Sequence, residues 1–460
     1  MANQIIIRVP DSCREERRHI LKWIFEERFQ LKMDIEFEKD RCQCSISLEG
    51  QVQSILLPDV FFGMYSGVEE QIPMPISPLK RVELGSRLLP VLFGHGYSEK
   101  GYSPSEEGAV ISVDIFGSAF WLLFRLEEVS PVVPLDRHSR FPFADSVAYR
   151  ENFLNYPLID HYLIFLQKVM EQVWSRPLAL RDSYRVTVSH DIDRPYLYHH
   201  LNPAKIIAKG IRAKSYSTAR QLWGKRNRAR VKPTSDPFFC MDKIMDLSES
   251  EGMKSAFYIL AGGANRKFDP CYHPDQQPFL DLLRRIESRG HAIGLHGSYE
   301  TGRNRELLLA EFTRLKRIPC LNSEEVKKTR QHYLRWHPLE TPRIHEELGI
   351  EEDASLCFAG HSGFRCGTCH SFAMFDLFRR EPLKLRQQPL IFMDTTVLSP
   401  IYRGPLSNEK IFQLCSSLSE NCKEVGGVFS MLWHNTFFAD ILGNNALENH
   451  ELYTHLLRTK

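Results

Sequence analysis

Two carboxylates follow a histidine in a short run whose residue types can bind a metal ion and move a proton. His190, Asp191 and Asp193 stand at the end of a predicted β-strand, Tyr184–Ser189. Carboxylates at positions i and i+2 of a regular strand share a face, but where the backbone turns, one can bind a metal while the other faces a substrate water. A strand-ending turn followed by Pro195, with an Asp side chain bonded to the backbone, also fits these residues. The motif alone leaves both interpretations open.

A second predicted strand, His291–Leu295, is also followed by a histidine. It comes after a predicted helix over Pro278–Arg289, and small polar residues and then Glu300 follow His296. Imidazole and carboxylate groups are ligands for Zn²⁺, and carboxylates also suit harder cations such as Mn²⁺ and Mg²⁺. The end of this strand therefore offers further candidate ligands.

The elements that must position these side chains alternate between strands and helices from Tyr184 onwards, with Ala256–Leu260 as a further strand. This alternation is typical of βαβ units, and in barrels the carboxyl ends of the strands carry the active site. Asp394 follows another predicted strand, Leu390–Met393, and so stands at such an end, although a turn cap with Thr395 also explains it.

The chain has 460 residues, which is too long for one core, because cores seldom grow beyond about 250 to 300 residues. Its first part mixes β-rich runs such as Ile5–Val9 with predicted helices over Asp114–Glu128 and Leu158–Val173. We therefore expect a smaller α/β domain over 1–180 and a second domain over 183–460.

The composition is that of a folded protein, with 43% apolar and 25% charged residues. The net charge of +2 provides no overall field for nucleic acid or an anionic membrane. The N-terminal residues lack the pattern of a secretory signal, and no apolar run reaches the roughly 18 residues of a membrane span. Eleven cysteines at irregular spacing fit reduced thiols, and the pair Cys366 and Cys369 lacks a second pair to complete a zinc knuckle. We expect a cytoplasmic protein.

The segment Lys205–Lys232 holds ten Lys or Arg residues and no Asp or Glu, within a predicted insertion over 200–235. It is either a solvated surface insertion or a local field for an anionic partner, such as a diphosphate or a membrane surface. Tyr216 and Trp223 are too sparse to stack the bases of a single strand, so nucleic acid is not expected.

Taken together, the motifs resemble those of the polysaccharide deacetylase family, also called NodB-like or carbohydrate esterase family 4. Ser189–Asp193 is similar to the first motif, and Gly290–Thr301 to the second, in which a strand end supplies a metal-binding histidine. Later segments resemble further motifs in the same order: Thr329–Trp336, Gly363–Thr368 and Met431–Asn435. Asp114–Glu128 is similar to the accessory domain of the branch found in surface-polysaccharide gene clusters. The resemblance implies a distorted (β/α) barrel in the second domain.

The resemblance also implies a role for each matching residue. For catalysis it implies Asp191 as general base, Arg330 as the partner that orients it, Tyr333 as oxyanion donor and His434 as general acid. For the metal it implies Asp193 and His296, and for the substrate Trp433 and Arg365. Asp394, at its own strand end, is a further candidate for contact with the substrate. The cation would be divalent, with Zn²⁺ expected first and Mn²⁺, Ni²⁺ or Co²⁺ as alternatives.

One departure from the family pattern concerns the third metal ligand. The family usually has a second histidine four residues after the first, where this chain has Glu300. Either Glu300 supplies an oxygen ligand there, or His332 from the third motif completes the site. If neither does, the domain would persist as a binding module without a metal.

The function that the resemblance implies is metal-dependent hydrolysis of an acetyl group, N-acetyl before O-acetyl, on a sugar. A nucleotide sugar or a glycan intermediate of surface polysaccharide biosynthesis would be the substrate. One alternative, motivated by Glu300, is a metal-free glycan-binding or scaffold protein on the same fold. Such a protein would need neither Asp191 nor His434. A third possibility is a deacylase for another amide, such as a formamido sugar.

Overall fold

The computed structural model describes residues 4–84, 87–95, 99–129, 135–199, 202–212, 215–263, 265–269, 272–402, 405–438 and 446–458. The chain divides into two compact units, each assembled from three segments. Unit 1 comprises Met1–Arg185, Leu334–Phe392 and Ser417–Phe429, and unit 2 comprises Val186–Tyr333, Met393–Ser416 and Ser430–Lys460. The predicted second domain, 183–460, is therefore shared between the two units, which gives the chain a mixed α/β fold with discontinuous parts.

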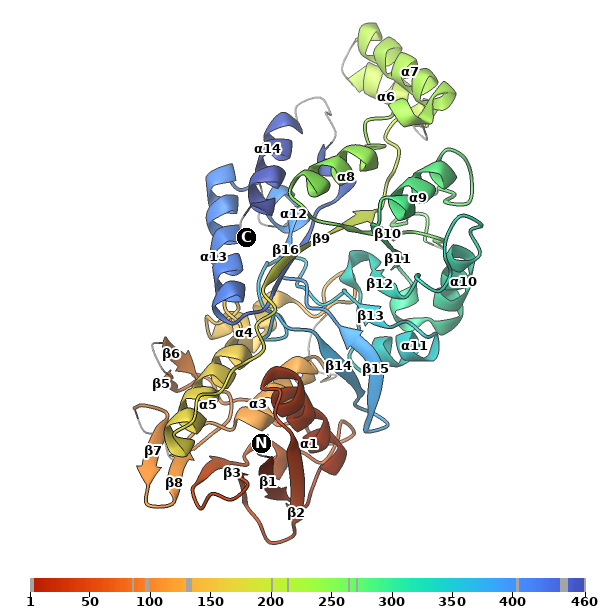
Figure 1. Ribbon diagram of the computed structural model, residues 1–460. Helices are drawn as coiled ribbons and strands as arrows, with labels where there is room; N and C mark the ends of the chain where they lie inside the picture. Colours follow the sequence, from red (N-terminus) through yellow and green to blue (C-terminus); the bar gives the residue numbers. More distant parts are fainter. Residues whose placement is uncertain are drawn as a thin grey trace. The chain divides into compact units, whose positions relative to one another are not determined.

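Unit 1 contains a six-stranded sheet in the order β2-β1-β3-β4-β8-β7 (Figure 1). Its strands are β1 (Ile5–Pro10), β2 (Met33–Glu38), β3 (Gln43–Leu48), β4 (Ser54–Pro58), β7 (Tyr102–Ser105) and β8 (Gly108–Ile111). β1 runs parallel to β2 and antiparallel to β3. The alternate residues Ile5, Ile7 and Val9 of β1 are fully buried, because successive side chains of a strand point to opposite faces.

The helices of unit 1 are α1 (Arg14–Leu21), which continues as a π-helical segment over Lys22–Arg28, α2 (Phe61–Met64), α3 (Ile115–Leu123), α4 (Val147–Arg150), α5 (Leu158–Trp174) and α11 (Thr341–Glu347). Further strands of this unit are β5 (Arg81–Leu84), β6 (Arg87–Pro90), β13 (Glu352–Asp353), β14 (Phe372–Asp376) and β15 (Glu381–Gln387). Asp114 caps α3, accepting a hydrogen bond from Gly117 N at 2.8 Å. The predicted helix over Asp114–Glu128 is confirmed as α3 but ends earlier, since Arg125 adopts a left-handed φ of 55°.

Unit 2 is built on strands in the order β12-β11-β10-β9, with β17 beside β9. The bounds are β9 (Arg185–Ile192), β10 (Ala256–Ile259), β11 (Ala292–Gly297), β12 (Lys328–Gln331), β16 (Phe392–Met393) and β17 (Val428–Leu432). The first residue of β9 and of β16 and the first two residues of β17 belong to unit 1. β10 pairs in parallel with β9 and β11, and β11 pairs in parallel with β12. The carboxyl ends of these four strands therefore meet at one edge. Among the described residues the strand order is linear and no pairing closes it, so the barrel stays a prediction.

The helices of unit 2 are α6 (Pro203–Arg212), α7 (Tyr216–Val231), α8 (Met241–Ser250), α9 (Phe279–Ser288), α10 (Arg305–Lys316), α12 (Asp394–Leu398) and α14 (Ala446–Leu457); α13 (Asn408–Glu424) begins here and ends in unit 1. In α9 the buried residues are Phe279, Leu282, Leu283 and Ile286, a spacing that places them on one face. The structure thus confirms the predicted helix and strands of this region to within two residues at each end, except that β9 runs three residues beyond the predicted end at Ser189 and includes Asp191. Along the described stretches, none of the helices has the length and apolar character that crossing a bilayer requires.

The predicted insertion over 200–235 folds mainly as the two helices α6 and α7, which project from the rest of unit 2 (Figure 1). Within it, residues 200–201 and 213–214 lie outside the described residues. The rest of unit 2 supplies the strand ends that carry the candidate site.

Candidate active site

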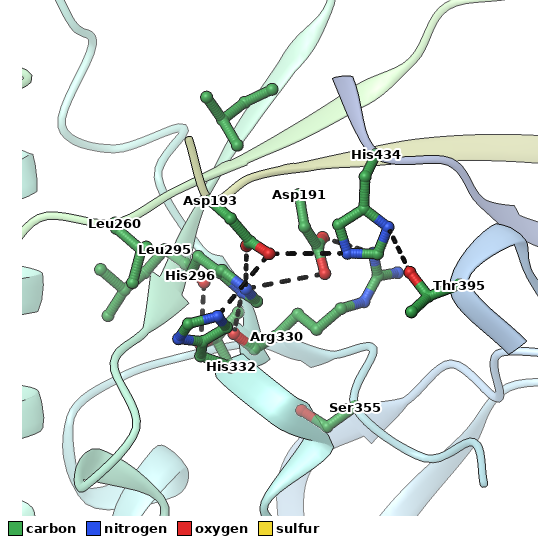
Figure 2. A network of polar contacts seen from close by, with 12 residues as sticks. Asp191, Asp193, Leu260, Leu295, His296, Arg330, His332, Ser355, Thr395 and His434 are labelled. Carbon is green, nitrogen blue, oxygen red and sulfur yellow. Dashed lines mark hydrogen bonds and ion pairs between the residues drawn. The ribbon is translucent and has the colours of Figure 1, made fainter. Parts of the chain in front are cut away.

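The carboxyl ends of β9, β11 and β12 bring five of the predicted site residues together (Figure 2). Asp191 lies in β9 and Asp193 directly follows it, His296 lies in β11, Arg330 lies in β12 and His332 directly follows it. His296 stands opposite Arg330 in the parallel pairing of their strands. Residues far apart in the sequence therefore meet because adjacent parallel strands end at the same edge.

Asp193, His296 and His332 form a group that can hold a metal ion. Each offers one ligand atom, and these atoms all lie within 4.8 Å of one another. His296 Nε2 lies 3.1 Å from Asp193 Oδ1, and His332 Nε2 lies 3.6 Å from Asp193 Oδ2. The two histidine side chains are 2% and 6% exposed, whereas Asp193 is 23% exposed. The carboxylate is thus the ligand that faces solvent.

The outer nitrogens of the two histidines are occupied by hydrogen-bond acceptors. His296 Nδ1 lies 2.9 Å from Arg330 O, and His332 Nδ1 lies 2.9 Å from Asp269 Oδ1. An imidazole that donates through Nδ1 presents a lone pair at Nε2, and such outer partners are typical of histidines that bind metals. Asp193 Oδ1 is buried and accepts no hydrogen bond from the described residues. The Nε2 atoms of both histidines and the carboxylate of Asp193 therefore face one another, which fits a divalent cation when both rings are neutral.

The electrostatics of this group also fit a cation. Burial lowers the pKa of His332, but Asp193 and Asp269 outweigh this effect and raise the pKa to about 9. Burial would raise the pKa of Asp193, yet His332, His296 and His434 hold it well below its usual value. The proton that these carboxylates keep on His332 occupies the place that a cation would take, since a ligand imidazole is neutral.

Asp191 and Arg330 form a buried ion pair beside this group. Arg330 Nη1 donates a hydrogen bond to Asp191 Oδ1 at 2.8 Å, and both side chains are 3% exposed. The guanidinium also lies over the ring of Tyr258, 4.4 Å from its centroid. Asp191 Oδ2 lies 3.7 Å from His296 Nε2. The pair fixes the carboxylate with its second oxygen turned toward the candidate ligands.

His434 and Asp394 form a second pair, just beyond the ends of β17 and β16. His434 Nδ1 lies 2.7 Å from Asp394 Oδ1, and His434 Nε2 lies 3.8 Å from Asp193 Oδ2. Burial lowers the pKa of His434, but the Asp394 carboxylate outweighs it and, with Asp193 and Asp191, raises the pKa to about 10. Asp394 is fully buried, and its carboxylate holds the His434 ring. Its predicted contact with substrate stays a prediction.

The structure places Glu300 outside the metal-binding group. Glu300 Oε1 accepts a hydrogen bond from Asn265 Nδ2 at 3.1 Å, and the described group of three is completed by His332. The difference arises because His332 directly follows β12, the neighbour of β11, whereas Glu300 belongs to the turn after its own strand. Of the two alternatives for the third ligand, the geometry favours His332.

The side chains of Trp433 and Arg365, both expected to contact the substrate, are buried and make contacts within the protein. The Trp433 indole is fully buried and packs against Tyr453, with ring centroids 5.4 Å apart. Arg365 belongs to unit 1, where its Nη2 and Nε donate hydrogen bonds to the buried Glu128 carboxylate at 2.5 and 3.0 Å. Both side chains therefore stabilise cores.

Tyr333 follows His332 and has an unusual backbone conformation. Its φ of 61° and ψ of 9° lie in the left-handed region, which costs a bulky residue on the order of 1–3 kcal/mol and is found at active sites more often than elsewhere. Its ring packs against Phe268 and Tyr299, with centroids 5.4 and 5.2 Å away. Its role as an oxyanion donor stays a prediction.

Sequence reasoning missed Asp269. Besides holding His332, the Asp269 carboxylate accepts a hydrogen bond from Tyr299 N at 2.9 Å and is 5% exposed. It lies in the segment after β10, where no motif marks it. The one feature that could have pointed to Asp269 is that β10 must end at the same edge of the sheet as its neighbours.

The chain is similar to one protein family over its first part and, more weakly, to a solved structure. A family model described as "Family of unknown function (DUF7033)" matches residues 5–175, which belong to unit 1 and include none of the metal-binding group. No curated protein matches the chain. A solved structure from Mycobacterium smegmatis, described as a "putative polysaccharide deacetylase", matches with a TM-score of 0.38 and 13% identity. The match covers 60% of this chain and 85% of that one.

Proposed function

We propose that the protein is a metal-dependent hydrolase that removes an acetyl group, N-acetyl in preference to O-acetyl, from a sugar or glycan intermediate. The observation that carries the proposal is the convergence of three elements in unit 2. These are the group Asp193, His296 and His332, the ion pair of Asp191 with Arg330, and the pair of His434 with Asp394. A metal site flanked by one anionic and one cationic proton-transfer group is what amide hydrolysis requires.

The metal-binding group would hold the cation through one carboxylate and two imidazoles. A divalent cation bound there supplies a Lewis acid that polarises a carbonyl and makes water more acidic near neutral pH. One carboxylate and two imidazoles form a set found in catalytic zinc sites, which keep a further position open. Zn²⁺ is therefore the first expectation, and Mn²⁺, Ni²⁺ or Co²⁺ remain alternatives.

Asp191 is the general base in this proposal. Because Arg330 holds Asp191 Oδ1, the other carboxylate oxygen is directed at the ligand cluster and can take a proton from water there. Arg330 thus acts by orienting the base.

His434 is the general acid. Its raised pKa keeps a proton on the ring at neutral pH, and Asp394 fixes the ring with Nε2 turned toward Asp193. An amine leaves an amide readily only when it is protonated, whereas an alcohol leaves an ester more easily without help. A protonated His434 therefore supports N-acetyl over O-acetyl substrates. What supports a sugar as the carrier of the acetyl group, and a place in surface polysaccharide synthesis, is the order of the sequence motifs.

The first experiment is metal content by mass spectrometry of the purified chain beside its Asp193→Ala and His296→Ala variants. We expect about one equivalent of a divalent metal, lost in both variants. The chain would then be screened for acetate release from acetylated nucleotide sugars, with Asp191→Asn as the variant that keeps the metal and loses hydrolysis by roughly 10²–10⁴-fold.

Two outcomes would contradict the proposal. No metal, even after incubation with Zn²⁺, Mn²⁺ or Co²⁺, would favour a glycan-binding module that needs neither Asp191 nor His434. Metal binding with formate release from formamido sugars but no acetate release would keep the hydrolase and change its acyl group.

A further inference from the structure

The helices α6 and α7 form a hairpin with a small core of its own. Ile206 from α6 packs with Leu222 and Ala229 from α7 and with Tyr198, and all four are buried. Figure 1 shows the two helices side by side, projecting from unit 2 beyond α8 and α9. Their outer faces are therefore open to whatever lies beside the protein.

The segment that forms this hairpin carries charge of one sign. The segment Lys205–Lys232 has ten basic and no acidic residues, although the whole chain has a net charge of only +2. The exposed basic side chains among the described residues include Lys205, Arg212, Arg220, Arg228 and Arg230. Such a concentration of basic side chains creates a local positive potential, even though the chain as a whole is nearly neutral.

The same faces expose apolar and aromatic side chains. On α6, Ile207 and Ile211 are 55% and 72% exposed and stand one turn apart on the same side. On α7, Tyr216 and Trp223 are 84% and 42% exposed and stand two turns apart, with Arg220 between them. Four large exposed apolar side chains on one short hairpin exceed the singly scattered residues that a soluble surface ordinarily shows.

Both ends of the hairpin are fastened to the framework of unit 2. The Asp236 carboxylate accepts hydrogen bonds from the backbone N–H groups of Leu197 and Tyr198, both at 2.7 Å. Asn435 Nδ2 donates to Arg194 O at 2.9 Å and to Phe238 O at 2.8 Å, which ties the entering and leaving chains together. The hairpin is thus a supported element rather than a loose loop.

We propose that the hairpin α6–α7 docks the protein on a membrane surface that contains anionic lipids. The basic side chains would contact the lipid phosphates, and the exposed Ile, Tyr and Trp side chains would enter the interface between headgroups and acyl chains. Each Lys or Arg near an anionic surface contributes about 1 kcal/mol, or roughly a fivefold gain in binding. Tyr and Trp are enriched at this depth because their rings have an apolar body and a polar atom.

Nucleic acid and soluble diphosphate are the other anions that a basic surface can bind, and neither accounts for the apolar residues. A nucleic-acid backbone or a diphosphate presents charged phosphate oxygens to the protein. Ile207 and Ile211 would bury no apolar surface against such a partner. Two exposed aromatic residues on α7 are also too few to form a stacking platform. A lipid interface uses both classes of side chain at once.

The test is sedimentation of the full chain with vesicles of phosphatidylcholine, with and without phosphatidylglycerol. We expect binding only with phosphatidylglycerol, and excess inorganic pyrophosphate or a single-stranded oligonucleotide should not displace the protein. The variant Arg220→Gln, Arg228→Gln, Arg230→Gln should bind about 100-fold more weakly, from fivefold per charge. The matched variant Arg284→Gln, Arg305→Gln, Arg317→Gln removes the same charge from exposed positions of α9, α10 and the end of α10, and should bind as the unaltered chain does.

Insertion can be read from a single side chain. All six tryptophans are described, and the other five, Trp23, Trp121, Trp174, Trp336 and Trp433, are at most 5% exposed. Quenching of fluorescence by brominated phosphatidylcholine therefore reports Trp223, and Trp223→Phe should abolish it. Ile207→Ser with Ile211→Ser should weaken binding at least tenfold.

The outcomes separate clearly. Binding that depends on the arginines of α7 and quenches Trp223 supports the proposal. Equal binding by both charge variants, absence of quenching, or displacement by the oligonucleotide would overturn it. The test uses neither a metal nor a sugar, so its result is independent of whether the proposed hydrolysis is correct.

Discussion

Replacing His332 by alanine should remove most of the metal affinity of the site, whereas replacing Glu300 by glutamine should not. His332 offers a lone pair to the group with Asp193 and His296, while Glu300 lies outside that group and is bonded to Asn265. The two variants therefore separate the two candidates for the third ligand.

The magnitudes follow from the contacts. Loss of an outer partner of a metal-binding histidine typically weakens binding 10–100-fold, about 1.4–2.7 kcal/mol, so Asp269→Asn should fall in that range. His332→Ala removes the ligand itself and should weaken binding by at least about 100-fold. Glu300→Gln leaves the ligands in place and should change affinity by no more than about 0.5 kcal/mol, roughly twofold.

The assay is competition for Zn²⁺ with a chromophoric chelator, with circular dichroism to show that each variant is folded. His273→Ala serves as the matched control, since His273 is exposed and lies outside the group. Loss of affinity in Glu300→Gln with retention in His332→Ala would refute the assignment of the third ligand. Equal retention in both would mean that the three side chains do not form a metal site.

Three other predictions follow from buried charges. Asp394→Asn should let the pKa of His434 fall toward its ordinary 6.5, so acetate release should drop about 30-fold at pH 8 and much less at pH 6. Arg365→Ala should lower the free energy of unfolding by about 3 kcal/mol in urea titrations while metal content is unchanged, because it removes one of the two guanidinium groups, Arg365 and Arg125, that pair with the buried Glu128 carboxylate; unchanged stability would instead favour the predicted contact with substrate. Burial lowers the pKa of His190 to about 3, so the unfolded chain binds a proton below about pH 6.5 that the folded chain does not, and stability should fall by about 2 kcal/mol between pH 7 and pH 5. His190→Gln should lose less over that interval, and an equal loss in both proteins would contradict the reasoning.

The strand ends of unit 2 were predictable because the signal is local. A short apolar run followed by polar residues marks Asp191, Asp193 and His296 without knowledge of the fold. The helix α9 was equally accessible, since its apolar residues recur at helical spacing. Parallel pairing of the strands then brings these ends together.

Other features depend on contacts that spacing does not encode. Whether His332 or Glu300 joins Asp193 depends on the register of β12 against β11 and on the turn after each strand. Trp433 and Arg365 have side chains that often contact ligands, but their burial is set by the residues that surround them in three dimensions. The division of the chain was hidden for the same reason, because Leu334–Phe392 and Ser417–Phe429 belong with unit 1 through long-range contacts.

The fastening of the hairpin by Asp236 and Asn435 has a consequence for how proteins of this architecture can diversify. An insertion that has its own core, and whose two ends are joined at the root, can be lengthened, shortened or exchanged while the sheet beneath it keeps its register. Asn435, which ties the two chains at the root, is the next residue after His434, the proposed general acid. The proposed membrane contact and the proposed chemistry of the strand ends could then change independently of one another in evolution.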